Sequence, residues 1–316
     1  MTIAFTFPGQ GSQAVGMGKA LAEAIPAARA VFDEVDQALG EKLSAIIWDG
    51  PDAELTRTRN AQPALMAVGM AVVRALEAEG IGIARRAAYV AGHSLGEYSA
   101  LAAAGSLSLA ETARLLRTRG EAMQEAVPEG EGAMAALLGL DLEPAVEIAA
   151  EAAGHEVCEV ANDNAPGQVV VSGEVAALRQ LIELAPPKTT LELPVSVPFH
   201  CSLLKDAAAG FAEVLQEVDM QDPAFPVWCN VDARPVTTAA AARDALRRQF
   251  AGSVQWQASI EGMLRDGVRR FVEFGPKAPL VKMVAQIASH LGVAGIATHA
   301  ATNAGEIEAL RTTGMR

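Results

Sequence analysis

The stretch AAYVAGHSLGEYSALAAAG, residues 87–105, decides the fold class. Its start, Ala87–Ala91, is a short apolar run typical of a buried strand, and Glu97–Ala104 has the composition of a helix. Between them lies Gly92-His93-Ser94-Leu95-Gly96, a G-x-S-x-G pattern that turns a strand abruptly into a helix and exposes a serine hydroxyl at the sheet edge. The pattern predicts a nucleophile at Ser94; the alternative is a tight turn whose serine only caps the helix.

Strands and helices alternate on both sides of this motif. The apolar run IAFTF, residues 3–7, predicts a buried strand that Pro8-Gly9 ends, and FVEF, residues 271–274, predicts a late strand ended by Gly275-Pro276. Apolar residues at helical spacing predict helices over 26–39, 63–76 and 109–125. This alternation indicates an α/β fold with a largely parallel sheet.

The middle of the chain has a different order of elements. It predicts strands over 133–140, 156–160, 168–172 and 191–197, with helices over 143–153 and 174–184. The βαββαβ order is that of a ferredoxin-like unit. We therefore expect a small ferredoxin-like subdomain at 128–196, inserted in a large α/β subdomain made of 1–127 and 197–316. The last residues, about 300–316, are small and polar and are expected to fray.

Composition excludes several classes of protein. The 316 residues are 51% hydrophobic and carry a net charge of −13, which supports a sizeable core and argues against nucleic-acid binding. The three cysteines have no CxxC spacing, so we expect no disulfide framework, no metal site and a reducing compartment. No apolar stretch reaches the ~20 residues of a membrane span, and the start lacks a leader pattern. We expect a soluble cytoplasmic protein without a membrane partner.

A second glycine-rich segment, Gly9-Gln10-Gly11-Ser12-Gln13-Ala14, imitates a nucleotide-binding loop. A dinucleotide site would need a second strand ending in an acid about 20 residues on, but a helical pattern lies there. A P-loop would need lysine at Met17. The remaining interpretations are a loop whose backbone N–H groups form an oxyanion hole, or a simple turn.

A serine nucleophile needs a base, and the chain has five histidines: His93, His155, His200, His290 and His299. His200, in the proline-stiffened PFHC junction at 198–201, is the most constrained, although order alone does not choose among them. No acid stands out as a third member. The helix at 109–125 carries Arg119 beside two other arginines, which by itself indicates only a solvated basic face.

Eight segments together carry a family resemblance. They are PGQGSQ (8–13), QPAL (62–65), AGHSLGEYSAL (91–101), RGEAMQEAVPEG (119–130), GAMAALLGL (132–140), PGQVVVSG (166–173), LPVSVPFHC (193–201) and VQW (254–256). In this order they resemble the malonyl-CoA:acyl carrier protein transacylase family over about residues 1–290. The resemblance implies a hydrolase-like large subdomain with the ferredoxin-like insertion already expected.

The resemblance also implies roles for single residues. Ser94 would be the nucleophile, and His200 its general base and later general acid. The backbone carbonyl of Gln255, in VQW, would accept from the far side of the histidine ring, which would explain the missing acid. The backbone N–H groups of Gln10 and Leu95 would form the oxyanion hole.

Arg119 would bind the free carboxylate of a malonyl group. The implied reaction moves malonyl from coenzyme A to the phosphopantetheine thiol of acyl carrier protein through a malonyl-serine ester, and it supplies fatty acid synthesis. Malonyl-CoA is a substrate and no cofactor is expected; we also expect a monomer. Two alternatives are a serine thioesterase or esterase with the same strand-turn-helix, and a non-catalytic subunit that kept the fold.

Overall fold

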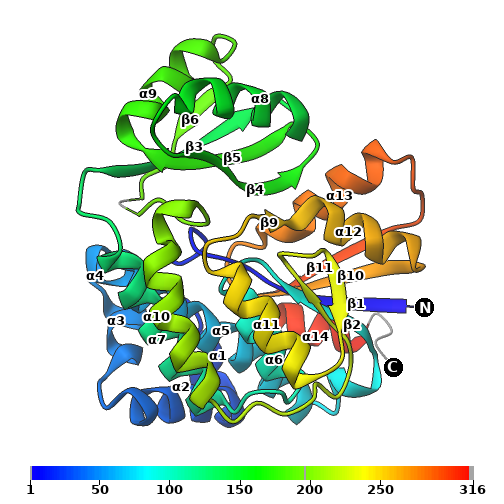
Figure 1. Ribbon diagram of the computed structural model, residues 1–316. Helices are drawn as coiled ribbons and strands as arrows, with labels where there is room; N and C mark the ends of the chain where they lie inside the picture. Colours follow the sequence, from blue (N-terminus) through cyan, green and yellow to red (C-terminus); the bar gives the residue numbers. More distant parts are fainter. Residues whose placement is uncertain (1, 196, 313–316) are drawn as a thin grey trace.

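Strand β1 (Thr2–Phe7) lies inside a six-stranded sheet of strand order β11-β10-β1-β2-β7-β8 (Figure 1). The computed structural model describes residues 2–195 and 197–312. The other strands of this sheet are β2 (Ala87–Gly92), β7 (Val227–Cys229), β8 (Arg234–Val236), β10 (Val268–Phe274) and β11 (Ala297–Ala301). All neighbours pair in parallel except β8, which is antiparallel to β7. The predicted largely parallel sheet is confirmed.

Helices pack around this sheet. They are α1 (Lys19–Ala24), α2 (Pro26–Leu39), α3 (Leu43–Asp49), α4 (Asp52–Thr56), α5 (Thr58–Ala78), α6 (Gly96–Ala103), α7 (Leu109–Glu125), α10 (Lys205–Glu217), α11 (Ala239–Gln249), α12 (Trp256–Arg265), α13 (Pro279–His290) and α14 (Ala304–Thr312). Helix α5 is buried along nearly its whole length. It contains Pro63 in its interior, so the sequence prediction, which began this helix at the proline, is wrong at that boundary.

A second sheet, of order β6-β3-β5-β4-β9, lies above the first in Figure 1. Its strands β3 (Gly132–Leu138), β4 (Cys158–Ala165), β5 (Gln168–Glu174) and β6 (Thr190–Glu192) alternate with α8 (Leu142–Ala153) and α9 (Val175–Leu184) in the βαββαβ order. The spatial order fourth, first, third, second makes the unit ferredoxin-like. Strand β9 (Val254–Gln255) lies outside 128–196 in sequence, yet it pairs in parallel with β4 and links the two sheets.

Two sequence predictions differ from the structure near chain junctions. The sequence predicts a strand over 191–197, but the structure has only the short strand β6 at Thr190–Glu192 in this region. Ser196 of the expected strand lies outside the described residues. The end of the chain does not fray up to Thr312, because α14 buries Ile307 and Leu310 against the large subdomain. Residues 313–316 lie outside the described part.

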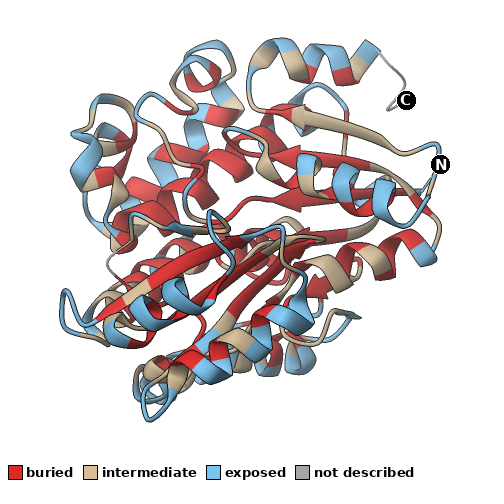
Figure 2. Cartoon of the chain, turned by 90° about the horizontal axis from the view of Figure 1, so that it is seen from above, coloured by how far each residue is buried: buried red, intermediate tan, exposed pale blue. Residues whose placement is uncertain are grey.

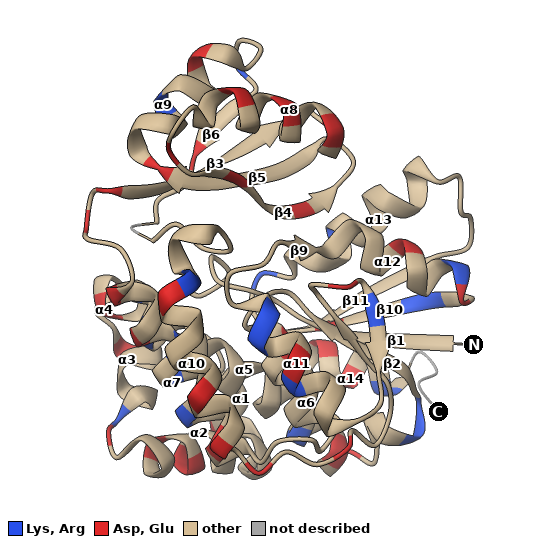
Figure 3. Ribbon diagram, viewed as in Figure 1, with Lys and Arg blue, Asp and Glu red and all other residues tan. Residues whose placement is uncertain are grey.

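Most buried residues are apolar, and a few charged residues, among them Glu97 and Arg119, are buried as well. Figure 2 shows buried residues along the strands of both sheets and exposed residues on the outer faces of the helices. Many charged residues lie on those helices, with several acids on α8 (Figure 3). Within residues 2–195 and 197–312, no helix is long and apolar enough to cross a membrane.

Candidate active site

Ser94 lies in the sharp turn between β2 and α6, with a backbone φ of 51°. A Cβ on Gly92 would lie 1.9 Å from the carbonyl carbon of Gly96, and a Cβ on Gly96 would lie 2.2 Å from the carbonyl oxygen of Phe7. Real Cβ atoms do not come so close to backbone, so both outer positions of the G-x-S-x-G pattern require glycine. The turn thus holds Ser94 in a left-handed conformation that few non-glycine residues adopt.

The Ser94 hydroxyl contacts His200, as the sequence suggested. The Ser94 Oγ lies 2.7 Å from His200 Nε2. On the other side of the ring, Nδ1 lies 3.1 Å from the carbonyl oxygen of Gln249 and 3.0 Å from that of Gly252. Because both of these partners can only accept, Nδ1 carries the proton and Nε2 is free to accept the serine proton.

The environment of His200 favours the neutral ring. Burial lowers its pKa to about 3, and the positive charge of Arg119 acts in the same direction. Its backbone also has a positive φ, 58°, so both members of the pair occupy strained backbone positions. A neutral imidazole at physiological pH is the form that can accept a proton from serine.

The structure corrects the acceptor assigned to Gln255. The Gln255 carbonyl oxygen accepts from Ser259 Oγ at 2.7 Å, and it is Gln249 and Gly252 that accept from His200. Helix α11 ends at Gln249, and the last carbonyls of a helix have no partner within it. The Gln249 carbonyl at this helix end accepts from His200 Nδ1 and, at 3.3 Å, from the Gly252 N–H, whereas the Gln255 carbonyl accepts from Ser259 of α12.

Arg119 lies on α7 and is only 1% exposed, so it does not belong to a solvated basic face. Its Nη1 donates to Gln62 Oε1 at 2.8 Å, and its Nη2 donates to Gln249 Oε1 at 3.0 Å and to Ser94 Oγ at 3.2 Å. All three acceptors are neutral, and within the described residues the Nε atom has no partner. The side chain is thus a buried cation that touches the nucleophile and lacks a direct carboxylate contact.

Polar side chains behind Ser94 fix its backbone. Asn230 Oδ1 accepts from the Ser94 N–H at 2.7 Å, and Gln249 Nε2 donates to the Ser94 carbonyl at 2.8 Å. Glu97 accepts from the Asn230 N–H at 2.9 Å and from Gln249 Nε2 at 3.0 Å. Burial raises the pKa of Glu97 to about 7, although these hydrogen bonds oppose the shift.

Gln10 and Leu95 both line the cavity that Ser94, His200 and Arg119 share, a space of about 520 Å³. Across the chain that the structure describes, neither backbone N–H makes a hydrogen bond, so both remain available to a ligand. Leu95 precedes the first turn of α6, where amide groups point outward. The structure therefore brings together all the predicted site residues except Gln255.

Sequence reasoning missed three polar residues of this site: Gln62, Asn230 and Gln249. Gln62 lies in the QPAL segment at 62–65, so its segment was noticed but its contact with Arg119 was not. Asn230 and Gln249 lie in no noticed segment and reach Ser94 across 136 and 155 residues of chain. Within residues 2–195 and 197–312, no group of three His, Cys, Asp or Glu side chains is placed to hold a metal.

Comparison with known proteins identifies the family. The family model "Acyl transferase domain" matches residues 4–313. The malonyl CoA-acyl carrier protein transacylase of Bacillus subtilis is 44% identical over 289 residues, 90% of each chain. That of Escherichia coli is 43% identical over 291 residues, 91% of this chain and 93% of the relative. The chain belongs to the malonyl CoA-acyl carrier protein transacylase family.

Solved structures of this transacylase family agree with that assignment. The acyl-carrier-protein S-malonyltransferase of Bartonella henselae is 47% identical with a TM-score of 0.94, over 98% of this chain and 99% of that one. A malonyl-transacylase solved in complex with its type II PKS acyl-carrier protein is 38% identical with a TM-score of 0.94, over 99% of this chain and 100% of that one. The transacylase resemblance read from the sequence is confirmed.

Proposed function

We propose that this protein transfers a malonyl group from coenzyme A to the phosphopantetheine thiol of acyl carrier protein through an ester on Ser94. One observation carries this proposal: the Ser94 Oγ contacts His200 Nε2 at 2.7 Å and the Arg119 guanidinium at 3.2 Å. The nucleophile therefore has a base on one side and a buried cation on the other. An acyl group that ends in a carboxylate can bind the cation while its carbonyl carbon is attacked by the serine.

In the first half-reaction, Ser94 Oγ attacks the thioester carbonyl and His200 Nε2 takes the hydroxyl proton. The carbon–sulfur bond then breaks, and the imidazolium returns that proton to the sulfur of coenzyme A. The carbonyl oxygens of Gln249 and Gly252 stabilise the transient imidazolium, because they accept from Nδ1–H throughout. Two neutral acceptors thus do the work for which many serine enzymes use a carboxylate.

The tetrahedral intermediate places negative charge on the former carbonyl oxygen. Gln10 and Leu95 line the shared cavity, and their backbone N–H groups are the donors that we assign to this oxygen. Loss of one such donor typically costs about 3–4 kcal/mol of transition-state stabilisation. The donors are backbone groups, so substitution of the two side chains leaves them in place.

Arg119 selects the acyl group. A malonyl carboxylate can accept from the guanidinium in two places, and it would supply the direct carboxylate contact that the side chain lacks among the described residues. An acetyl group leaves the cation buried without a charged partner. We therefore assign to Arg119 a preference for malonyl over acetyl groups.

The second half-reaction repeats the first in reverse. The phosphopantetheine thiol gives its proton to His200 and its sulfur attacks the Ser94 ester, so that serine recovers its proton as the leaving group. The reaction requires no cofactor beyond the thioester substrate. The cysteines 158, 201 and 229 are buried and unpaired, which supports the predicted cytoplasmic location.

Intact-mass spectrometry with malonyl-CoA tests the proposal. The wild type gains the mass of one malonyl group and loses it when acyl carrier protein is added, whereas Ser94→Ala gains none. Rapid release of free malonate without a persistent acyl-enzyme would instead support the thioesterase alternative. Absence of any adduct on the folded wild type would contradict a covalent route.

A further inference from the structure

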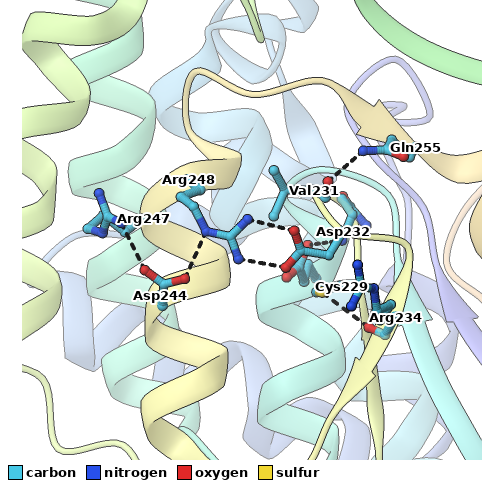
Figure 4. Close-up of polar contacts among 10 residues, drawn as sticks. Cys229, Val231, Asp232, Arg234, Asp244, Arg247, Arg248 and Gln255 are labelled. Atoms are coloured by element: carbon cyan, nitrogen blue, oxygen red, sulfur yellow. Dashed lines mark hydrogen bonds and ion pairs between the residues drawn. The ribbon is translucent and has the colours of Figure 1, made fainter.

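We propose that the ion pair between Arg248 and Asp232 is a positioning device for the catalytic histidine. Arg248 Nη1 donates to Asp232 Oδ1 at 2.7 Å and Nη2 donates to Oδ2 at 2.6 Å, so the contact is bidentate (Figure 4). Its Nε also donates to Asp244 Oδ2 at 2.8 Å. The Nε, Nη1 and Nη2 atoms of Arg248 thus each donate to a carboxylate oxygen, and these three bonds fix the orientation of the guanidinium plane.

The pair joins the two segments that hold the nucleophile and the base. Asp232 follows β7, two positions after Asn230, the residue that accepts from the Ser94 N–H. Arg248 directly precedes Gln249 at the end of α11, where the carbonyl groups accept from His200. The ion pair therefore joins the support of Ser94 to the support of His200, beside the Gln249 side chain, whose Nε2 donates to the Ser94 carbonyl at 2.8 Å and to Asn230 Oδ1 at 3.3 Å.

The end of α11 leaves little freedom elsewhere. The Gly252 N–H donates to the Gln249 carbonyl at 3.3 Å, and a Cβ on Gly252 would lie only 2.6 Å from the Arg248 carbonyl oxygen. The Gln255 N–H, three positions after Gly252, donates to the Asn230 carbonyl at 3.0 Å, so the chain beyond Gly252 is held to Asn230 through backbone. If Arg248 shifts, the carbonyls of Gln249 and Gly252 shift with it.

Stability is not the main effect of this pair. The side chains of Arg248 and Asp232 are 35% and 36% exposed, and pairs with such access to water contribute little to folding. The hydrogen bonds from Arg248 hold the pKa of Asp232 below its ordinary value, so the acid stays ionised at neutral pH. A pair that is bidentate and charged at neutral pH but weakly stabilising fits a geometric role.

The inference rests on the proposed roles of Ser94 and His200, and the variant Arg248→Met tests it. We expect kcat for malonyl transfer to fall about ten-fold or more while KM changes less than about two-fold, because the base is displaced and the substrate pocket is not. Arg248→Lys should lose less activity than Arg248→Met, because lysine keeps the positive charge beside Asp232. It should not reach the wild-type kcat, because an ammonium cannot bind both oxygens of Asp232 in the bidentate geometry.

Arg247→Met is the matched control. Arg247 lies on the same helix and its Nη2 donates to Asp244 Oδ1 at 2.8 Å, but it does not contact Asp232 (Figure 4). We expect this variant to keep kcat within about two-fold of the wild type. Asp232→Asn should reproduce the Arg248→Met defect, and the double variant should add nothing further, because both changes break one contact.

A spectroscopic readout separates positioning from general loss of activity. In the folded wild type, the His200 Nδ1–H between two carbonyls should give a slowly exchanging, downfield proton resonance in ¹⁵N-labelled protein. Arg248→Met should move or broaden this resonance, and Arg247→Met should not. Equal kcat and an unmoved resonance in Arg248→Met and Arg247→Met would overturn the inference. An inactive wild type would contradict the proposed function instead, while the resonance would still report on the pair.

Discussion

Substitution of Arg119 by alanine removes a buried guanidinium that contacts the nucleophile. The wild-type side chain is 1% exposed, and among the described residues it donates to three neutral oxygens, those of Gln62, Gln249 and Ser94. A substrate carboxylate that enters this site forms a buried charge pair. The loss of one partner of such a pair typically costs about 2–5 kcal/mol.

This free energy converts directly into rate. At 1.36 kcal/mol for each factor of ten, kcat/KM for malonyl-CoA should fall roughly 30- to 5,000-fold in Arg119→Ala. The value for acetyl-CoA should fall far less or rise, because acetyl makes no charge pair and the variant no longer carries an uncompensated cation. The ratio of the two kcat/KM values therefore isolates the carboxylate contact from other damage to the site.

Steady-state transfer to acyl carrier protein with each thioester measures this ratio. Arg114→Ala is the control, because Arg114 lies on the same helix with its side chain exposed, and it should leave both values unchanged. Thermal melting of both variants checks the fold. Equal losses for malonyl and acetyl transfer would refute the assignment of Arg119 to the malonyl carboxylate.

Three further outcomes follow from the site and its surroundings. Gln255→Ala should keep kcat within about two-fold of the wild type, whereas Gly252→Ala should lower kcat. The added Cβ would lie 2.6 Å from the Arg248 carbonyl oxygen and would move a carbonyl that accepts from His200, so equal kcat values for the two variants would contradict this prediction. Burial lowers the pKa of His200 from 6.5 to about 3, so the acid limb of kcat/KM should lie well below pH 6.5, and a His200-dependent limb at 6.5 would be inconsistent with the site. Burial raises the pKa of Glu273 from 4.5 to about 8, so between these pH values the folded state holds a proton that the unfolded chain has lost. The free energy of unfolding should therefore fall as pH rises from 4.5 to about 8. Denaturation at several pH values should show a weaker dependence in Glu273→Gln, and an unchanged slope would contradict the role of Glu273.

Local sequence signals predicted the parts of the fold that depend on neighbouring residues. The helix expected over 109–125 appears with these bounds, because Ser108 and Glu111 form a capping box that fixes its start. The strand-turn-helix around Ser94 also appears, since two glycines are sterically required there. By contrast, β7, β8 and β9 are only two or three residues long, too short for a hydrophobic period to emerge.

The histidine acceptors illustrate what residue types cannot show. Every residue carries a backbone carbonyl, so no side-chain pattern distinguishes Gln249 and Gly252 from Gln255. What distinguishes Gln249 is its position at the end of α11, where its carbonyl lacks a partner within the helix. That position is fixed by packing between distant segments, so the sequence predicted the histidine that contacts Ser94 but not the groups that orient its ring.

The positive φ angles of Ser94 and His200 lower the stability of the fold at two positions that the proposed activity requires. Glycine would adopt either conformation without steric penalty, yet glycine at position 94 or 200 carries no hydroxyl or imidazole. Laboratory selection for heat resistance alone would therefore favour relaxed, inert chains at these two positions. Variants that resist heat and still turn over substrate must gain their stability from other parts of the molecule.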